Sequence, residues 1–503
     1  MPVWNFVWRS AYHDSVTLMR LTRDMEAVPG VERAAAMMGT PQNRALLADA
    51  GLLPPDAPDT APADLLIAVA AADEAAASGA EAAARTALLT GPPRARGGLS
   101  GAPDRRARTL TSAIRTLPDA SLALISVPGL YAAAEARKAL HMGLHVMLFS
   151  DNVPVEAELE LKRLALGQGL FLMGPDCGTA LLNGVPLGFA NAVPRGRIGI
   201  AAASGTGLQE VSTLVARYGE GISHGIGVGG RDLTDAVGGL MMSRALVVLA
   251  EDEATEVLCV IGKPPGKAVA ARLASEIGRL GKPCVAHFVG SGSGSLEDCA
   301  RAAVAQARKE RPIATEFTMP AGEVERLVAE AARGLAPGQR CISGVFAGGT
   351  LAWEARAILA AVLPDVAPDV TSGAGAHRVV DLGEDMFTVG RPHPMIDGSV
   401  RREWIVREAA DPATAILLLD VILGYGAHPD PAGELVPALE RARTDARARQ
   451  RGLAIVACVV GTDGDPQGRQ AQVATLTAHG VIVMPSNAQA ARLAARIARA
   501  VSG

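Results

Sequence analysis

A glycine-rich turn with two hydroxyl side chains follows an apolar run near the middle of the chain. The run reads RIGIAAA, the turn comprises Ser204, Gly205, Thr206 and Gly207, and apolar residues then resume at helical spacing. This pattern predicts a strand, a tight turn and a helix. The turn would lie at a helix N-terminus, where free N–H groups and the helix dipole favour a phosphate or carboxylate ligand. A turn built from glycine and a hydroxyl cap for backbone reasons alone fits the residues equally well.

Arg231 is a second candidate for binding an anion. It follows Gly229 and Gly230, and its planar guanidinium group can make paired hydrogen bonds to a carboxylate or phosphate. A surface salt bridge with Asp232 or Asp235 is the alternative. Gly229 and Gly230 are included in the predicted binding site because they precede this arginine in a turn.

His393 is the third candidate. Pro392 and Pro394 restrict the backbone on both of its sides, and Arg391 lies close in sequence. A histidine held in this way can act as an acid, a base or a donor to an oxyanion. We therefore predict catalytic roles for His393, Arg391 and Arg231; a histidine that caps a structural turn is the alternative for His393.

The turn after Ala203 has a counterpart later in the chain. There, Gly348, Gly349 and Thr350 follow the apolar run RCISGVF, and in both stretches a glutamate stands four residues after the threonine. Two further pairs of segments correspond in order, GIGVGGRD with LLLDVILGYGAHPD, and VLCVIGKPPGK with AIVACVVGTDGDPQGR. These matches predict two related parallel α/β domains, at about 195–310 and 338–503, with an insertion between about 365 and 411 in the second.

Ligands of open parallel sheets bind outside the carboxyl ends of the strands. We therefore expect the glycine turns of both domains to lie at functional edges. The second domain would complete the site through the loop that contains Gly424, Gly426 and Ala427, together with Gly348, Gly349 and Thr350.

Composition excludes several classes of protein. The 503 residues carry a net charge of −4, which gives the chain as a whole no electrostatic preference for nucleic acid. Six cysteines without a CxxC pair predict a reduced, intracellular protein with no metal site of the zinc-ribbon type. No segment resembles a signal peptide or a membrane span, so we expect a cytoplasmic protein.

Periodicity divides the chain into five parts. Residues 1–90 alternate strands and helices in a small α/β domain, and residues 91–114 form an arginine-, proline- and glycine-rich linker. A β-α-β pattern occupies 115–194, with helices expected over 131–141 and 156–166. The two related domains follow at 195–310 and 311–503.

Several motifs resemble succinyl-CoA synthetase. GPDCGT, RIGIAAASGTGLQE and GVGGRD resemble its α subunit, and VFAGGTLAWEA with LLLDVILGYGAHPDPAG resembles the carboxyl-terminal domain of its β subunit. A single chain that joins these parts and contains MMGTP, GPDCGTA, GGRDL and TVGRPHPMID resembles the FdrA family of acyl-CoA synthetase-like proteins. The resemblance implies an α/β multidomain fold, with a Rossmann-like CoA-binding-type domain at 115–194 and two flavodoxin-like domains after it.

The chain departs from the synthetase pattern in three places. The first 110 residues lack the glycine-rich loop that binds the CoA pyrophosphate, so CoA binding is doubtful. The stretch 291–303 contains no histidine to carry a phosphoryl group, and His287 lies within an apolar strand, where a core role is expected. The ATP-grasp domain is absent, so ATP is not expected as a cofactor.

The resemblance implies a subunit that acts with companion subunits in purine (allantoin) degradation. Its reaction would be carbamoyl transfer between phosphate and oxamate or oxalurate, on a small anionic substrate. A CoA-linked acyl ligase or acyl-CoA transferase is the first alternative, and a non-catalytic anion-binding scaffold is the second. Neither a membrane nor a nucleic acid is expected as a partner.

Overall fold

The chain forms two compact units in the computed structural model, which describes residues 1–11, 13, 15–90, 107, 109–292, 294–367, 377–388 and 392–502. The first unit contains residues 1–120, 126–128 and 385–393. The second contains residues 121–125, 129–384 and 394–503. Most of the predicted linker 91–114 lies outside the described residues, apart from the short helix α4 (Leu110–Thr116) at its end. No described helix is long and apolar enough to cross a membrane.

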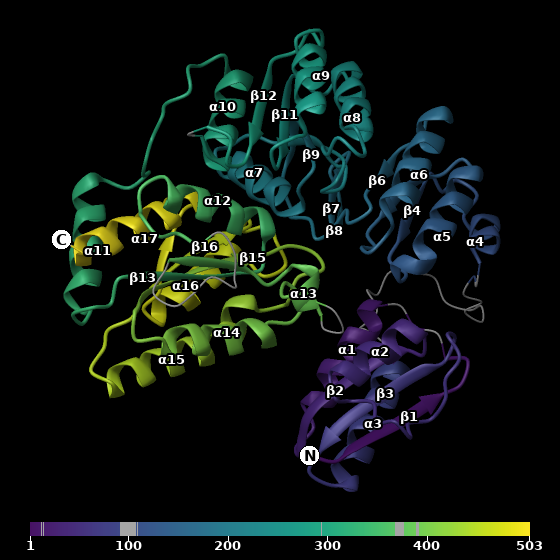
Figure 1. Ribbon diagram of the computed structural model, residues 1–503. Coiled ribbons are helices and arrows are strands. Elements are labelled where there is room, and N and C mark those ends of the chain that lie inside the picture. The colour runs from purple at the N-terminus through teal and green to yellow at the C-terminus, as the bar shows by residue number, and fades with distance from the viewer. Residues whose placement is uncertain are drawn as a thin grey trace. The chain divides into compact units, whose positions relative to one another are not determined.

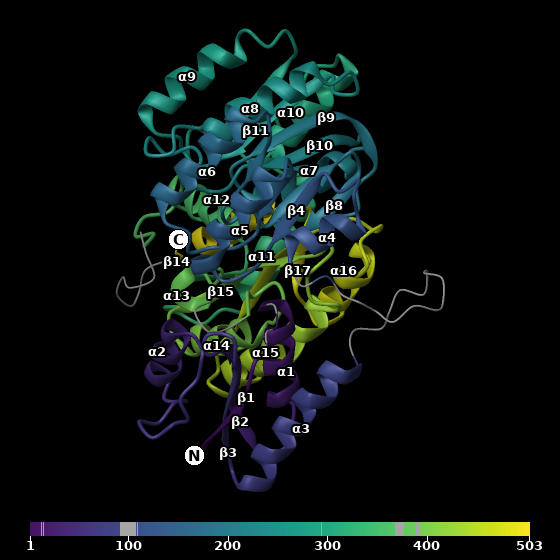
Figure 2. The ribbon, with the colours of Figure 1, turned by 90° about the vertical axis from the view of Figure 1, so that its right-hand side faces the viewer.

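A three-stranded antiparallel sheet organises the first unit. Its strands pair in the order β1-β3-β2, in agreement with the alternation of strands and helices predicted for residues 1–90. Alternate side chains of the sheet pack against α1 and α3 on one face and against α2 on the other, and Figure 2 shows α2 and α3 on opposite sides of the strands. The elements are β1 (Val3–Trp8), α1 (Ser15–Glu26), β2 (Val31–Met38), α2 (Pro41–Asp49), β3 (Leu65–Ala71) and α3 (Glu74–Thr90).

The second unit begins with a small parallel sheet in the order β4-β5-β6. The two helices expected over 131–141 and 156–166 are confirmed as α5 and α6. The elements are β4 (Leu122–Ile125), α5 (Gly129–His141), β5 (His145–Leu148), α6 (Val155–Gly167) and β6 (Leu172–Met173).

A six-stranded sheet follows, in the order β12-β11-β9-β10-β7-β8. Its four long strands are parallel, and the hairpin of β7 and β8 adds to the edge strand β10 in antiparallel orientation. The sheet therefore starts at Thr179, before the boundary predicted at 194. The elements are β7 (Thr179–Leu182), β8 (Val185–Gly188), β9 (Arg195–Ala202), α7 (Gly205–Arg217), β10 (Ile222–Gly227), α8 (Leu240–Glu251), β11 (Val257–Gly262), α9 (Lys267–Ile277), β12 (Cys284–Phe288) and α10 (Leu296–Arg308).

A five-stranded, fully parallel sheet completes the unit, in the order β14-β13-β15-β16-β17. Figure 1 shows its strands from green to yellow, with α14 and α15 on one side and α12 and α17 on the other. The elements are α11 (Ala321–Arg333), β13 (Cys341–Phe346), α12 (Gly349–Ala360), β14 (Arg378–Asp381), α14 (Ser399–Ala410), β15 (Thr414–Ile422), α15 (Pro431–Ala448), β16 (Ala454–Val460), α16 (Arg469–Ala478), β17 (Ile482–Met484) and α17 (Asn487–Ser502). The short helix α13 (Asp385–Thr388) belongs to the first unit.

The two larger sheets share one topology. In each, a central strand (β9 or β13) leads through a helix (α7 or α12) to an edge-side neighbour (β10 or β14), and the next strand (β11 or β15) lies on the other side of the central strand. The turns at Gly205 and Gly349 therefore occupy equivalent places, as predicted.

The correspondence predicted between the later segments of the two domains was wrong. The counterpart of β10 is β14, not β15, so the region 365–411 contains a strand of the repeat and is not an insertion. Strand β14 has four residues, of which only Val379 and Val380 are buried, and among the described strands it pairs with β13 alone. An edge strand of this kind gives a weak apolar signal in the sequence.

A buried cluster of charges joins α6 to the turn after β10. Lys162 Nζ lies 2.8 Å from Glu158 Oε1 and 2.7 Å from Asp232 Oδ1, and it donates to the carbonyl oxygen of Val228 at 3.1 Å. The side chains of Lys162, Glu158 and Asp232 are all buried. Asp232 also accepts hydrogen bonds from the amides of Met241 and Met242 in the first turn of α8, so the cluster around one ammonium group connects three elements.

We expect Lys162→Met to lower the free energy of unfolding by about 3–5 kcal/mol, because it leaves two buried carboxylates without their shared cation. Urea denaturation measures this loss. Lys138→Met is the matched control: Lys138 is exposed and pairs with Glu135 on the surface of α5, so its removal should change the unfolding free energy by less than about 1 kcal/mol. Equal stability of the two variants would contradict a central role for the buried cluster.

Candidate functional site

The amino ends of α7 and α12 meet at a pair of buried hydroxyl groups. Ser204 is the N-cap of α7, and its Oγ accepts a hydrogen bond from Gly207 N at 2.9 Å. The same Oγ lies 2.6 Å from Oγ1 of Thr350, in the first turn of α12. Both residues are more than nine-tenths buried. The predicted turn and its repeat therefore face each other across the two related domains.

Backbone N–H groups are free at this junction. The amides of Gly205, Thr206, Gly349 and Thr350 belong to the first turns of their helices, where no intrahelical acceptor exists. Across the described residues, the structure gives these four amides no other acceptor. Two helix N-termini with free donors and two hydroxyl groups suit an anion such as a phosphoryl group.

The turn before α12 is organised by a carboxylate of the protein itself. Asp420, in β15, accepts hydrogen bonds from Ala347 N at 2.9 Å and Gly348 N at 2.8 Å. Arg401 donates to Asp420 Oδ1 at 3.0 Å. Burial raises the pKa of Asp420, and Arg401 and the two amides oppose this increase. The amide of Gly348, predicted to bind the ligand, is therefore already occupied.

A second carboxyl group lies against the first turn of α12. Asp381 ends β14, its Oδ1 accepts from Gly383 N at 2.8 Å, and its Oδ2 occupies the space that a side chain at Gly349 would need. Burial raises the pKa of Asp381 to about 7, with smaller contributions from Glu384 and Asp420. At neutral pH this group is protonated in a large fraction of molecules, and a protonated carboxyl can donate a hydrogen bond to an anion.

Sequence reasoning missed Asp381. The available signal was an acidic residue directly after a short apolar strand, at the carboxyl edge of a sheet where ligands bind. Because β14 was not recognised as a strand, its last residue was not considered.

The side chain of Arg231 is held by contacts within the protein. Its guanidinium group lies 2.9 Å from Glu158 Oε2 and donates to the carbonyl oxygen of Val153 at 2.7 Å. The alternative stated for Arg231, a salt bridge with Asp232 or Asp235, was wrong, because the carboxylate that it contacts is that of Glu158. Gly229 has a φ of +88°, and a Cβ atom there would lie 2.5 Å from Pro175 O, so this turn uses glycine for close packing.

The loop with Gly424, Gly426 and Ala427 packs against residues 188–191. Tyr425 N donates to Ala190 O at 2.8 Å, and Gly424 has a φ of +119° with no room for a side chain beside Ala190. The side chain that meets Ser204 is Thr350. The role of this loop in binding a phosphoryl group stays a prediction.

The histidine predictions have different outcomes. His287 is buried, burial lowers its pKa, and its Nε2 has no hydrogen-bond partner among the described residues; the core position expected for it is confirmed. His393 is half-buried and belongs to the first unit, whereas Ser204 and Thr350 belong to the second. Arg391 lies outside the described residues. The roles of His393 and Arg391 stay predictions.

Two family models match the chain. Residues 345–497 match the family described as CoA-ligase, and residues 1–103 match the family described as "AllF, heavy metal-associated domain". Residues 1–103 contain no cysteine. Among the described residues, no group of three or more His, Cys, Asp or Glu side chains could hold a metal ion. Residues 1–103 therefore offer no thiolate, which is one of the ligand types that soft metals prefer.

Individual proteins match different lengths of the chain. The α subunit of succinate–CoA ligase (ADP-forming) from Aquifex aeolicus is 31% identical over 29% of this chain, which spans about half (49%) of that subunit. The apo structure of dinucleotide-forming acetyl-coenzyme A synthetase 1 from Ca. Korarchaeum cryptofilum is 17% identical, with 78% of this chain and 86% of that chain covered and a TM-score of 0.31. The protein YahF of Escherichia coli K12 is 38% identical over 96% of both chains. The chain therefore belongs to the family of E. coli YahF, and its C-terminal part contains a CoA-ligase domain.

Proposed function

We propose that this chain catalyses acyl transfer with an acyl phosphate bound between the first turns of α7 and α12. The observation that carries the proposal is the contact of Ser204 with Thr350, because it joins the first turns of α7 and α12, which contain the four free amides and the two hydroxyl groups. The CoA-ligase domain supports this class of chemistry.

The residues at the junction suit each stage of such a transfer. The amides of Gly205 and Thr206 would bind the phosphoryl oxygens, and a hydroxyl group of the Ser204–Thr350 pair would donate to the acyl oxygen as negative charge develops on it. The acceptor attacks the acyl carbon, the bond from that carbon to the phosphate oxygen breaks, and the phosphate leaves with the electron pair. The proton of the acceptor ends on the released phosphate.

A CoA thiol is the acceptor that the comparisons favour. The family model that matches residues 345–497 is described as CoA-ligase, and the relative from Aquifex aeolicus is a subunit of succinate–CoA ligase. Carbamoyl transfer between phosphate and oxamate is the second candidate. The sequence favours it because the loop 291–303 has no histidine for a phosphoryl relay, and a carbamoyl phosphate reaction needs none. The proposal includes companion subunits and no use of ATP.

The acceptor is identified by incubating the full chain with acetyl phosphate or carbamoyl phosphate, in the presence of CoA or oxamate. Thioester formation would select the first acceptor, and loss of free oxamate with release of phosphate would select the second. Saturable binding of carbamoyl phosphate without turnover, with companion subunits present, would indicate an anion-binding scaffold and overturn the catalytic proposal.

We expect Thr350→Val to lower turnover by roughly a hundredfold, which is the usual effect of removing one donor to a developing oxyanion. Thr255→Val is the matched control, because Thr255 forms an equally buried hydroxyl pair with Ser223 at the same 2.6 Å separation. Ser223 lies in the first half of β10 and Thr255 just before β11. Both are therefore near the amino ends of the parallel strands, whereas the site lies at the carboxyl ends. Initial rates and melting temperatures of both variants are compared with the parent. A Thr350→Val variant with parental turnover would refute the role of this hydroxyl.

Anion binding should depend on the protonation of Asp381. Sulfate is the suitable probe, because its own charge is constant across the neutral range. We expect sulfate affinity to fall by about tenfold per pH unit above pH 7 in the parent, since the ionised carboxylate repels the anion, and to be independent of pH in Asp381→Asn. Calorimetric titration between pH 6 and 9 measures this.

The same substitution has a stability signature. Because the folded-state pKa is raised, Asp381 contributes most to stability below its ordinary pKa of 3.8, and this contribution is lost as the pH rises to about 7. Asp381→Asn should remove that part of the pH dependence of unfolding. Identical pH profiles for parent and variant, in both binding and stability, would refute the raised pKa as the cause.

A further inference from the structure

A separate cavity lies at the other end of α7. It has a volume of about 720 Å³ and is bordered by the β7–β8 hairpin, the segment before β9, the end of α7 and the loops after β15 and β16. Arg217, the last residue of α7, lines it, whereas Ser204 caps the first turn of the same helix. Thirteen helical residues span about 20 Å, so the cavity is distinct from the Ser204–Thr350 junction.

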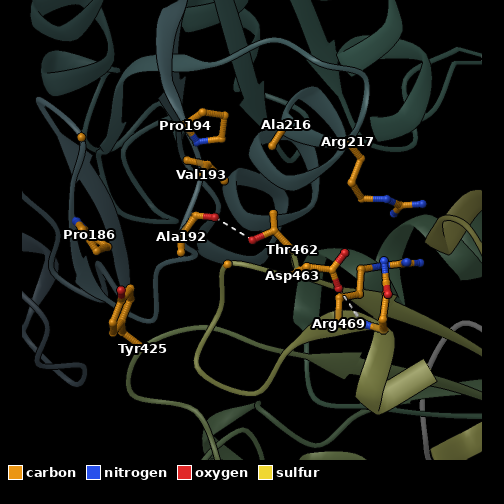
Figure 3. A pocket seen from close by; sticks show the side chains of 13 residues that line it. Pro186, Ala192, Val193, Pro194, Ala216, Arg217, Tyr425, Thr462, Asp463 and Arg469 are labelled. Atoms are coloured by element: carbon orange, nitrogen blue, oxygen red, sulfur yellow. Dashed lines mark hydrogen bonds between the residues drawn. The ribbon is translucent and has the colours of Figure 1, made fainter. Parts of the chain in front are cut away.

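Two arginines line one side of this cavity (Figure 3). Arg217 Nη1 donates to the carbonyl oxygen of Pro485 at 2.7 Å, and Arg469 Nε donates to that of Val459 at 3.2 Å. Neither guanidinium group forms a salt bridge with any carboxylate in the described ranges, and both therefore have donors available for a ligand. Burial and the charge of Arg217 lower the pKa of Arg469 to about 10, and the charges of Glu210 and Asp463 oppose this decrease.

The other side of the cavity has apolar and aromatic side chains. Tyr425 and Pro186 both line the cavity, and Figure 3 shows them on the side away from the arginines. Tyr425 is 44% exposed even though it lies between two glycines whose backbone is packed against residues 188–191. An exposed aromatic ring on a fixed backbone offers a stacking surface for a heterocyclic base.

We propose that this cavity binds a phosphorylated nucleoside. The phosphate would accept paired hydrogen bonds from Arg217 and Arg469, and the base would lie against Tyr425 and Pro186. The volume falls within the range of cavities that hold small molecules of this size. Asp463, which also lines the cavity, and Glu210 act on Arg469 through their charges without forming a salt bridge with it. A phosphate would add further negative charge and offset the mutual repulsion of the two cations.

Two sources share this chemistry: a free nucleotide, and the phosphorylated adenosine portion of CoA. The test is calorimetric titration of the full chain with AMP, CoA, adenosine and inorganic phosphate. Binding of AMP selects a nucleotide site, and binding of CoA but not AMP selects the second source. We expect adenosine, which lacks the phosphate, and inorganic phosphate, which lacks the base, each to bind at least about tenfold more weakly than the better of the two nucleotides.

Arg469→Gln and Arg217→Gln should each weaken nucleotide binding by at least about tenfold. Arg326→Gln is the matched control, since Arg326 is an exposed arginine of α11 paired with Glu330, and it should bind as the parent does. Tyr425→Ala should weaken binding of the nucleotide and leave inorganic phosphate unchanged. Because Arg217 also holds Pro485, Arg217→Lys is included: it keeps the charge and should retain more affinity than Arg217→Gln if the variant folds with a parental melting temperature.

The proposal is overturned if neither AMP nor CoA gives saturable binding at millimolar concentration. It is also overturned if the arginine variants bind as tightly as the Arg326→Gln control. Thr350→Val separates this site from the proposed acyl-transfer site, because it should lose turnover and keep parental nucleotide affinity. Failure of acyl transfer with intact nucleotide binding would therefore refute only the proposed function, and the reverse result only the nucleotide site.

Discussion

An exchange of helix caps between the two related domains fixes the arrangement on which the site depends. Glu210 of α7 accepts the amide of Asn487, the first residue of α17, at 3.0 Å. Glu354 of α12 accepts the amide of Leu296, the first residue of α10, at 2.6 Å. Each glutamate thus caps the last helix of the other domain. Because Glu210 and Glu354 stand about one turn after the amino ends of their own helices, the caps also fix the contact between Ser204 and Thr350.

These caps are maintained against an electrostatic penalty. The pKa values of Glu210 and Glu354 are raised to about 7, mainly by burial. The charge of Glu297 contributes to both increases, and the charge of Glu354 contributes to that of Glu210. The hydrogen bonds from Asn487 and Leu296 oppose the increase but do not cancel it. The contribution of both glutamates to stability is therefore largest below their ordinary pKa of 4.5 and declines as the pH rises to about 7. A neutral pH places the junction of the domains near the midpoint of this titration.

Local sequence patterns predict the helices that carry the two capping glutamates, but not the residues that these glutamates cap. The spacing from Thr206 to Glu210 is repeated from Thr350 to Glu354, so the turns, the helices and their equivalence could be predicted from local periodicity. The acceptor and donor of each cap could not, since Glu210 and Asn487 are separated by 277 positions and only the fold brings them together. Strand β14 and its terminal Asp381 were missed for a different reason: four residues with two buried valines carry too little pattern to identify a strand.

The charges around the two facing helices also indicate how an anion would be oriented. Each helix N-terminus carries about half a positive charge, so two of them at one point repel each other unless negative charge is nearby. At α12, Asp420 binds the preceding amides and Asp381 lies beside Gly349. The first turn of α7 has no acidic residue, and its Gly205 and Thr206 amides have no acceptor among the described residues. The uncompensated positive potential therefore lies on the α7 side, and the more negative end of an acyl phosphate, its phosphoryl group, is stabilised best there, with the acyl group directed toward Thr350 and Asp381.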